Sequence, residues 1–394
     1  MILYLAAFSF ILFLAIKTDQ DSQNRPLYSL AIWTIFICFV CGFRDMLGGY
    51  DSYIYGEVFD VTSNELDRGV PFNQTTAFRL NEKEQGYALL NVLVGYISAN
   101  RYIFLLIISI ITFASLFHHI KNYTKYPHLS FFILFCLLYF FTFTYLRQVL
   151  AACIAWYSIP FAVKRKPIHF FLIVALAASF HNSALLFGLT YFISNKRFTK
   201  QQIILFLIAS LLLGLTPIAT TIFDVLGGSV NEEKASGSLS STGSVRFEYI
   251  LEAAFFLVLI IYRYDSIAKD KLSTCMLNIS LMFMFVLTFF VKFPDGGRMS
   301  WFFLIGIAST IAEIAQDENN VATIKFVSIT VLSLLFLRVL FAWGPIVTPY
   351  KSFLTNGVRE NDKVWSMYEY DHNYDNDKFY RPIFKFTASN EDNY

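Results

Sequence analysis

Four arginines lie beside long apolar stretches of the sequence, where a permanent positive charge is costly unless it has a partner. A guanidinium stays protonated in proteins, and its planar fork can hydrogen-bond two oxygens of one phosphate. If the apolar stretches are membrane helices, all four arginines end at the same face of the membrane. The pattern therefore predicts a site for the diphosphate of a membrane lipid, formed by Arg44, Arg147, Arg298 and Arg246.

Arg147 is the strongest of these candidates. It lies in FTFTYLRQVLAACIAW, between two apolar runs and at an expected outer turn with almost no loop around it. An arginine in such a place needs an anionic partner, which is either a protein carboxylate or a ligand phosphate. Gln148 adds a neutral hydrogen-bond donor beside it, which favours the ligand.

Arg44 opens the sequence RDMLGGYDSYIY, in which a Gly-Gly pair allows a sharp turn. Such a turn brings Arg44 and Asp51 toward one cavity, with Tyr55 one helical turn further along. The alternative is that Arg44 anchors the end of a helix and that Asp51 only forms the turn.

Three ionisable residues are candidates for the proton transfer that chemistry at such a site would need, and the sequence does not rank them. Asp51 follows the Gly-Gly turn. His181 stands in SFHNSA, at a break between two apolar stretches, where a hydrogen-bonded core histidine is the alternative. Glu252 shares a helix face with Glu248, about 10 Å below the expected helix start, where a structural ion pair is the alternative.

The turn FPDGGR and the segment before 86–98 supply further polar groups on the same expected side. Arg298 begins a helix, where the helix dipole disfavours a cation, and a bound anion would explain its presence. The residues predicted to bind substrate are Gln148, Glu84, Tyr55 and Asp295.

No metal site and no cofactor are expected. All five cysteines fall inside apolar runs, and the C-x-x-C pair at Cys38 and Cys41 has no second pair to complete a zinc site.

The composition identifies a membrane protein. Of the 394 residues, 56% are hydrophobic and 15% are charged, and the mean hydropathy is +0.52. A soluble fold of this size buries only about three quarters of its surface, so lipid has to cover the excess of apolar surface. The net charge of +2, spread over the chain, gives no sign of nucleic-acid binding.

Apolar runs near the length of a hydrocarbon core predict an all-helical polytopic protein with about 11–13 transmembrane helices. The stretches 86–98 and 168–194 are expected to be re-entrant or broken helices. The expected spans are 1–16, 27–43, 102–119, 129–145, 147–163, 168–180, 183–194, 201–219, 246–263, 273–291, 298–315 and 321–343.

Positive charge marks one side of these spans as cytoplasmic. If 86–98 does not cross, every compact basic loop falls on that side, and the other side receives the loops 44–101 and 220–245. The chain thus divides into a transmembrane domain, 1–343, and an aromatic, acidic C-terminal tail, 344–394, on the outer side. The aromatic residues of the tail either bind a sugar chain or pack the tail against the outer loops.

Four short motifs resemble, in order and spacing, those of the EpsG-type, Wzy-like family of bacterial polysaccharide polymerases. The resemblance covers residues 1–345 and leaves the tail unexplained. Asn182 stands where this family commonly has a second histidine. The motifs are R-x(4)-G-x-D-x(3)-Y from Arg44 to Tyr55, E-x-x-Y-x-x-x-N from Glu84 to Asn91, L-R-Q-x-L-A at 146–151 and F-H-N-S-A at 180–184.

The resemblance implies a multi-pass glycosyltransferase of the bacterial inner membrane that needs no metal. It would transfer a glycan from undecaprenyl diphosphate onto a lipid-linked repeat unit at the outer face, and so polymerise an exopolysaccharide, a capsule or an O antigen. Its expected partners are an undecaprenyl-diphosphate-linked oligosaccharide, the lipid bilayer, and a flippase and a chain-length regulator of the same pathway. In this scheme the four arginines bind the diphosphate, and Asp51, Glu252 or His181 is the base.

Three other functions remain open at this point: a lipid-linked glycan flippase or transporter, another lipid-linked-sugar transferase, and a membrane acyltransferase built around His181. A transporter predicts polar residues throughout the bilayer depth and symmetry between two halves, whereas the candidates here gather toward the outer side. An acyltransferase predicts a basic cytoplasmic entrance near His181, which the expected layout does not supply.

Overall fold

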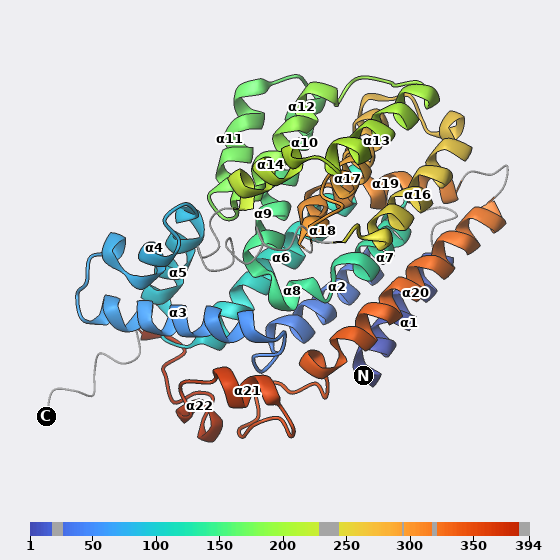
Figure 1. The fold of residues 1–394 in the computed structure, drawn as a ribbon. Coiled ribbons are helices and arrows are strands. Elements are labelled where there is room, and N and C mark those ends of the chain that lie inside the picture. The colour runs from blue at the N-terminus through green and yellow to red at the C-terminus, as the bar shows by residue number, and fades with distance from the viewer. Residues whose placement is uncertain (18–26, 228–243, 294, 317–320, 386–394) are drawn as a thin grey trace, which may run out of the picture.

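The computed structural model describes residues 1–17, 27–227, 244–293, 295–316 and 321–385. Over these residues the chain is built from helices, and its only strand-like pairing is a single bridge between Arg44 and Ser352 (Figure 1). The all-helical class predicted from the sequence is therefore confirmed. Most of the predicted loop 220–245 and the end of the tail lie outside the described residues.

Five helical segments of the described chain are long and apolar enough to cross a membrane, so the chain is a multi-pass membrane protein. The third and fourth of these segments form the core, because 83% of each spanning window is buried. The fifth lies at the periphery, because only 28% of its spanning window is buried. In chain order the five are α6 (Arg101–Tyr123), α9 with α10 (Leu146–Val163), α17 (Lys271–Phe289), α18 with η5 and α19 (Gly296–Ala315), and α20 (Val321–Val347).

Shorter apolar helices pack around this core. The sequence predicts about 11–13 crossings, whereas five helices, or six spans if a bent pair counts as one, meet the length and composition of a crossing. Part of the difference arises because breaks shorten helices, as where the predicted span 129–145 divides into α7 and α8. The rest arises because unbroken helices such as α1 and α2 are only 16 and 15 residues long. The shorter helices are α1 (Ile2–Lys17), α2 (Tyr28–Gly42), α7 (Pro127–Leu138), α8 (Phe141–Thr144), α11 (Pro167–Ala178), η3 (Asn182–Leu189), α12 (Thr190–Ile193) and α16 (Phe247–Tyr262).

The predicted span 201–219 is not one helix. Its two parts, α13 (Lys200–Gly214) and α14 (Pro217–Gly227), meet at 83°. Pro217 has no amide hydrogen for the preceding turn and disfavours helical backbone in the residue before it. Gly214 lets this bend press on α17, because a Cβ there would lie 2.5 Å from the Phe289 carbonyl oxygen. A proline therefore turns the chain where hydropathy alone predicts a straight span.

Of the two stretches predicted to be re-entrant or broken, 168–194 is broken, whereas 86–98 is a continuous helix. The segment 168–194 is interrupted between α11 and η3, and His181 has extended backbone there, with a φ of −156°. The segment 86–98 forms α5 (Gln85–Ile97), whose 13 residues are short for a crossing.

The segment between α2 and α6 forms a helical lobe beside the bundle, where α21 lies against α3 (Figure 1). Gly49, with a φ of 85°, begins α3 in a conformation that favours glycine. The lobe and tail elements are α3 (Tyr50–Asp67), η2 (Phe72–Gln74), α4 (Thr76–Leu80), α5, α21 (Lys363–Tyr368) and α22 (Asn373–Asn376).

The described part of the tail packs on this lobe through its aromatic residues. Tyr374 is fully buried, and the hydroxyls of Tyr370 and Tyr374 donate hydrogen bonds to Asp60 on α3 at 2.7 and 3.2 Å. The Phe353 main-chain N–H donates to the Phe43 carbonyl at 3.0 Å. The tail is thus joined to the end of α2 as well as to α3.

Candidate functional site

Arg147 and Glu84 form an ion pair at the centre of the candidate site. Arg147 Nη1 lies 2.5 Å from Glu84 Oε2 and 2.9 Å from Asn81 Oδ1. The Glu84 side chain is 3% exposed, and the Arg147 side chain is 26% exposed. A buried carboxylate needs such a partner, because an isolated charge is costly to remove from water. Of the two partners expected for Arg147, the protein carboxylate is therefore present.

Several helix ends bring these side chains together. Arg147 is the second residue of α9, Glu84 directly precedes α5, and Asn81 directly follows α4. The rings of Tyr55 and Tyr87 each lie 5.7 Å from the Arg147 guanidinium carbon, within the range of a cation–π contact. The site is consequently framed by the lobe on one side and by the bundle on the other.

The break between α11 and η3 adds a third side. Glu84 Oε1 accepts a hydrogen bond from the main-chain N–H of Asn182 at 3.1 Å and lies 4.0 Å from His181 Nδ1. That nitrogen accepts a hydrogen bond from the main-chain N–H of Ser183 at 3.3 Å, which caps η3. The proton of the neutral imidazole is then on Nε2. His181 therefore offers a hydrogen-bond donor at Nε2, and its basic nitrogen is occupied.

Arg298 reaches the same place from the start of α18. Its guanidinium carbon lies 4.6 Å from the centre of the Tyr145 ring, and its Nε lies 3.6 Å from Asp295 Oδ1. Gln148 is buried and donates a hydrogen bond from Nε2 to the Arg298 carbonyl at 2.8 Å. Gln148 thus ties the first turn of α9 to the turn that carries Arg298.

His181 lies near both arginines, in a turn outside the spanning helices. Burial, together with the positive charges of Arg147 and Arg298, lowers the pKa of His181 to about 3. The imidazole is therefore neutral at physiological pH. Two arginines and a neutral histidine that are far apart in sequence are thus close enough in the fold to interact electrostatically.

Both guanidiniums have an end that is open to a ligand. In the described part of the chain, Arg147 Nη2 and the two terminal nitrogens of Arg298 make no hydrogen bond, and 25% of the Arg298 side chain is exposed. Accessible guanidinium nitrogens without partners suit the oxygens of an anion. We refer to Glu84, Arg147, His181 and Arg298 as the arginine site.

Arg44 lies elsewhere and is enclosed. Its side chain donates hydrogen bonds to three main-chain carbonyls, those of Cys41 at 2.6 Å, Leu47 at 3.0 Å and Phe143 at 3.0 Å. It is fully buried. These contacts fit the alternative of a helix-end anchor, and each of its three nitrogens already has an acceptor.

Asp51 lies in the first turn of α3, one helical turn before Tyr55, with which it interacts electrostatically. Because residues four apart share a face of a helix, Asp51 is on the face of α3 that carries Tyr55 toward Arg147. Asp51 therefore lies one helical turn from Tyr55, the residue of α3 that contacts Arg147.

The start of α16 lies next to the turn that carries Arg298. Arg246 pairs with Glu248 at 3.3 Å, with both side chains about two-fifths exposed. Glu252, one turn further along, interacts electrostatically with Arg338 of α20. Of these groups, none contacts the arginine site in the described residues, so Arg246 and Glu252 are separate from it.

Sequence reasoning missed two polar side chains and one main-chain group of the site. The Asn81 side chain accepts a hydrogen bond from Arg147, and the main-chain N–H of Asn182 donates one to Glu84. The Tyr87 ring makes a cation–π contact with the Arg147 guanidinium. The E-x-x-Y spacing of Glu84 and Tyr87 was a usable signal, because the two lie one turn apart at the start of α5. Asn81 stands among charged residues and gives no such signal.

Among the described residues, no group of three or more His, Cys, Asp or Glu side chains could hold a metal ion. All five cysteines are buried and unbridged.

Comparison with known proteins gives one match. A model described as the EpsG family matches residues 27–352, which is more than half of the chain and includes the whole arginine site. No curated protein and no solved structure matches the chain.

Proposed function

The chain belongs to the EpsG family, which is linked to polysaccharide biosynthesis, and on this premise we propose that it polymerises a cell-surface polysaccharide. The substrate would be a glycan on undecaprenyl diphosphate, and the acceptor a lipid-linked repeat unit. The reaction would take place at the outer face of the bacterial inner membrane. The distribution of the basic loops predicts that the arginine site faces this side.

One observation carries this proposal: two partly exposed arginines with open ends lie close enough to one neutral histidine to act on it electrostatically. Arginine is the preferred residue for binding phosphate oxygens, because its donors match their spacing. A diphosphate has oxygens for both guanidiniums, and its lipid places it at the level of a membrane surface.

The proposed reaction is a displacement at the anomeric carbon of the donor glycan. A hydroxyl oxygen of the acceptor sugar forms the new glycosidic bond, the bond from the anomeric carbon to the phosphate oxygen breaks, and the hydroxyl proton passes to a base. Undecaprenyl diphosphate leaves with the bonding electrons. Arg147 and Arg298 would stabilise the charge that grows on it, and Nε2–H of His181 would donate to one of its oxygens.

Asp51 is our choice for the base. It lies on the face of α3 that leads to Arg147, and an ionised carboxylate accepts a proton from a hydroxyl. His181 suits this role less, because its Nδ1 already accepts a hydrogen bond. Glu252 suits it less, because its electrostatic partner is Arg338, outside the site.

The remaining candidates take supporting roles in this proposal. Glu84 holds Arg147 in place, and Gln148 holds the carbonyl of Arg298. Tyr55 and Asp295 each face one of the two arginines and would border the sugars. Arg44 fixes the turn before α3, and Arg246 stays outside the diphosphate site.

The experiment that tests this function is a reconstituted reaction. The purified protein in liposomes receives the host's undecaprenyl-diphosphate repeat unit, without nucleotide sugar, and the products are separated by glycan length. We expect a ladder of increasing lengths with the wild-type protein and none with Arg147→Ala. Arg68→Ala, a change at an exposed arginine in the same lobe, is the matched control and should keep the ladder.

Two results would contradict the proposal. Movement of the lipid-linked glycan across the bilayer without any ladder would replace the polymerase with a flippase, which by the same chemistry would also bind the diphosphate. An unchanged ladder with correctly inserted Arg147→Ala would remove the arginine site from the mechanism.

A further inference from the structure

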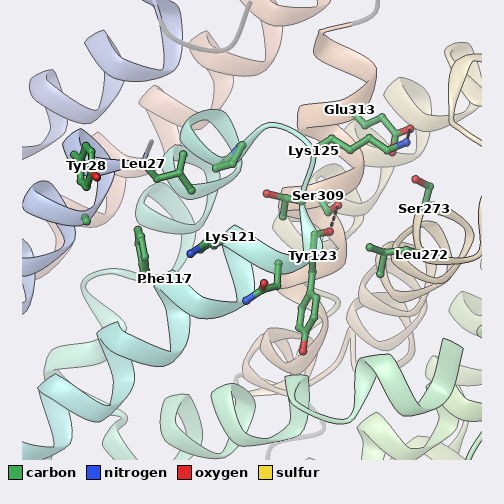
Figure 2. Close-up of a pocket in the computed structure, with 14 residues that line it drawn as sticks. Leu27, Tyr28, Phe117, Lys121, Tyr123, Lys125, Leu272, Ser273, Ser309 and Glu313 are labelled. Carbon is green, nitrogen blue, oxygen red and sulfur yellow. Dashed lines mark hydrogen bonds and ion pairs between the residues drawn. The ribbon is translucent and has the colours of Figure 1, made fainter. Parts of the chain in front are cut away.

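A cavity of about 740 Å³ lies between helix ends (Figure 2), and none of the residues that line it belongs to the arginine site. It is bordered by the start of α2, the end of α6 and the segment after it, and the ends of α17 and α19 that lie beside them. Its walls combine aliphatic and aromatic residues with lysines, a glutamate and two serines. The cavity residues used below are Tyr28, Ala31, Phe117, Lys121, Lys125, Ser273 and Glu313.

The cavity lies at the predicted cytoplasmic side of the membrane. Helix α6 begins at Arg101, which pairs with the tail, and runs to Tyr123 at the cavity. The loops that border the cavity, 119–128 and 263–271, are two of the compact basic loops that mark the cytoplasmic side. In this predicted orientation, the helix ends that border the cavity lie at the headgroup level of the inner leaflet.

One end of the cavity carries an unpaired cation. In the described residues, Lys121 makes no ion pair or hydrogen bond through its side chain, and it is exposed. Figure 2 shows Lys121 beside Phe117, apart from the pair formed by Lys125 and Glu313 on the other side of the cavity. An unpaired lysine at this level suits the phosphate of a lipid, to which it is attracted as a point charge.

The other end carries a carboxylate and hydroxyls. Lys125 Nζ lies 3.0 Å from Glu313 Oε1 and 3.3 Å from Asp270 Oδ2, so this lysine is already paired with two acids. Glu313 Oε1 also accepts the main-chain N–H of Ala268 at 3.0 Å. This end of the cavity therefore presents a carboxylate and a serine hydroxyl, which favour a headgroup that donates hydrogen bonds.

Two apolar faces lead from the bilayer into the cavity. Along α2, Tyr28, Ile32 and Ile35 are 73%, 67% and 55% exposed, and they follow one face of the helix. Along α6, Ile110 is 46% exposed and lies on the face that ends at Lys121. Because α2 and α6 pack along each other, these faces form one apolar surface beside the cavity. Acyl chains can lie on it while a headgroup enters.

We propose that this cavity binds a glycerophospholipid of the inner leaflet whose headgroup carries hydrogen-bond donors beyond the phosphate. The phosphate pairs with Lys121, the donors of the headgroup face Glu313 and Ser273, and the acyl chains follow Tyr28 and Ala31 along α2 and α6. Phosphatidylethanolamine and phosphatidylglycerol share this chemistry, and phosphatidylcholine lacks the donors. The site is independent of the polymerase function.

The test is lipid retention by the full-length protein in detergent, counted by native mass spectrometry after incubation with each of the three lipids. We expect the ethanolamine or glycerol lipid to be retained at least tenfold more than phosphatidylcholine. Lys121→Gln should reduce this retention at least tenfold. Lys164→Gln changes an exposed lysine of another cytoplasmic loop and should leave retention unchanged.

Two outcomes overturn the proposal: equal retention of phosphatidylcholine, and unchanged retention in Lys121→Gln. Because Lys121 is exposed and unpaired in the described structure, its substitution should not disturb folding, and a matching thermal unfolding curve verifies this. Glu313→Gln separates the two ends of the site. It should lower retention of the ethanolamine lipid more than that of the glycerol lipid, because only the ammonium loses an ion pair, and an equal loss for both would contradict the assigned orientation.

Discussion

Two clusters of arginine and carboxylate lie in the predicted outer half of the molecule, and they differ in what their arginines leave open. In the arginine site, Arg147 and Arg298 are each about one quarter exposed and keep terminal nitrogens without partners. In the second cluster, Arg101 is fully buried and donates from Nη2 to both oxygens of Glu369 at 2.8 and 2.9 Å. We refer to Asp60, Arg101, Glu369 and Arg381 as the tail cluster.

The tail cluster is enclosed by the protein itself. Arg381 of the tail lies 2.8 Å from Asp60, and the Arg101 guanidinium lies 4.0 Å from the centre of the Tyr374 ring. Each charge is therefore met by a charge or a ring from a segment far away in sequence. The same residue types thus hold a fold together when they are enclosed and can meet a ligand when they are partly open.

The largest effect on stability is expected at Arg101. Arg101→Ala leaves Glu369 and Asp60 buried with fewer partners, and breaking a buried pair costs about 3–5 kcal/mol. Thermal unfolding in detergent should show a clear fall in the melting temperature, and limited proteolysis should release the tail. The transfer rate per folded molecule should stay near that of the wild type. A stable variant without activity would reverse the roles of the two clusters.

Arg298→Gln should show the opposite behaviour. Loss of one donor to a developing negative charge typically lowers a rate by about 100-fold or more, and a partly exposed side chain contributes little to folding. We expect this loss in glycan transfer at an unchanged melting temperature. Activity within about threefold of the wild type would exclude Arg298 from the diphosphate site.

Gln148→Met should have an intermediate effect. The substitution keeps the volume of the buried side chain but removes the amide that binds the Arg298 carbonyl, a hydrogen bond worth about 1 kcal/mol, or about fivefold in rate. Because the amide positions Arg298, the fall should appear in kcat more than in KM. A change in melting temperature with no change in kcat would make Gln148 purely structural.

The smallest effect is expected at Arg246. Arg246→Gln removes an exposed ion pair with Glu248, and such pairs contribute about 0–1 kcal/mol. Both the transfer rate and the melting temperature should stay close to those of the wild type. A loss as large as that of Arg298→Gln would extend the diphosphate site to the start of α16.

The sequence was informative where a charge stood alone in an apolar setting. Arg147 and His181 could be selected because nothing near them in sequence compensates them. The partner of Arg147 could not be assigned with the same certainty, since Glu84 lies 63 residues away and reaches it only through the path of the lobe. The all-helical class could be predicted from the long apolar runs. The break at His181 could be predicted because His181 and Asn182 interrupt such a run.

Arg44 and Arg298 show where such reasoning stops. Each stands at an expected helix end within four residues of a Gly-Gly pair, and the sequence gives them equal weight. Only the folded chain distinguishes them. The Arg44 guanidinium meets three main-chain carbonyls, those of Cys41, Leu47 and Phe143. Arg298 instead faces a ring and a single carboxylate. Arg101 was overlooked for a related reason, because an arginine that begins a helix also looks like a simple anchor.

The most direct test of the central claim is the affinity of the purified protein for undecaprenyl diphosphate, measured by calorimetry in detergent. Arg147→Lys keeps the charge but loses the planar fork, so we predict binding weaker by about tenfold or more, while Arg68→Lys binds like the wild type. Equal affinity of Arg147→Lys and the wild type would show that the partly open arginines do not bind the diphosphate, and it would contradict the account.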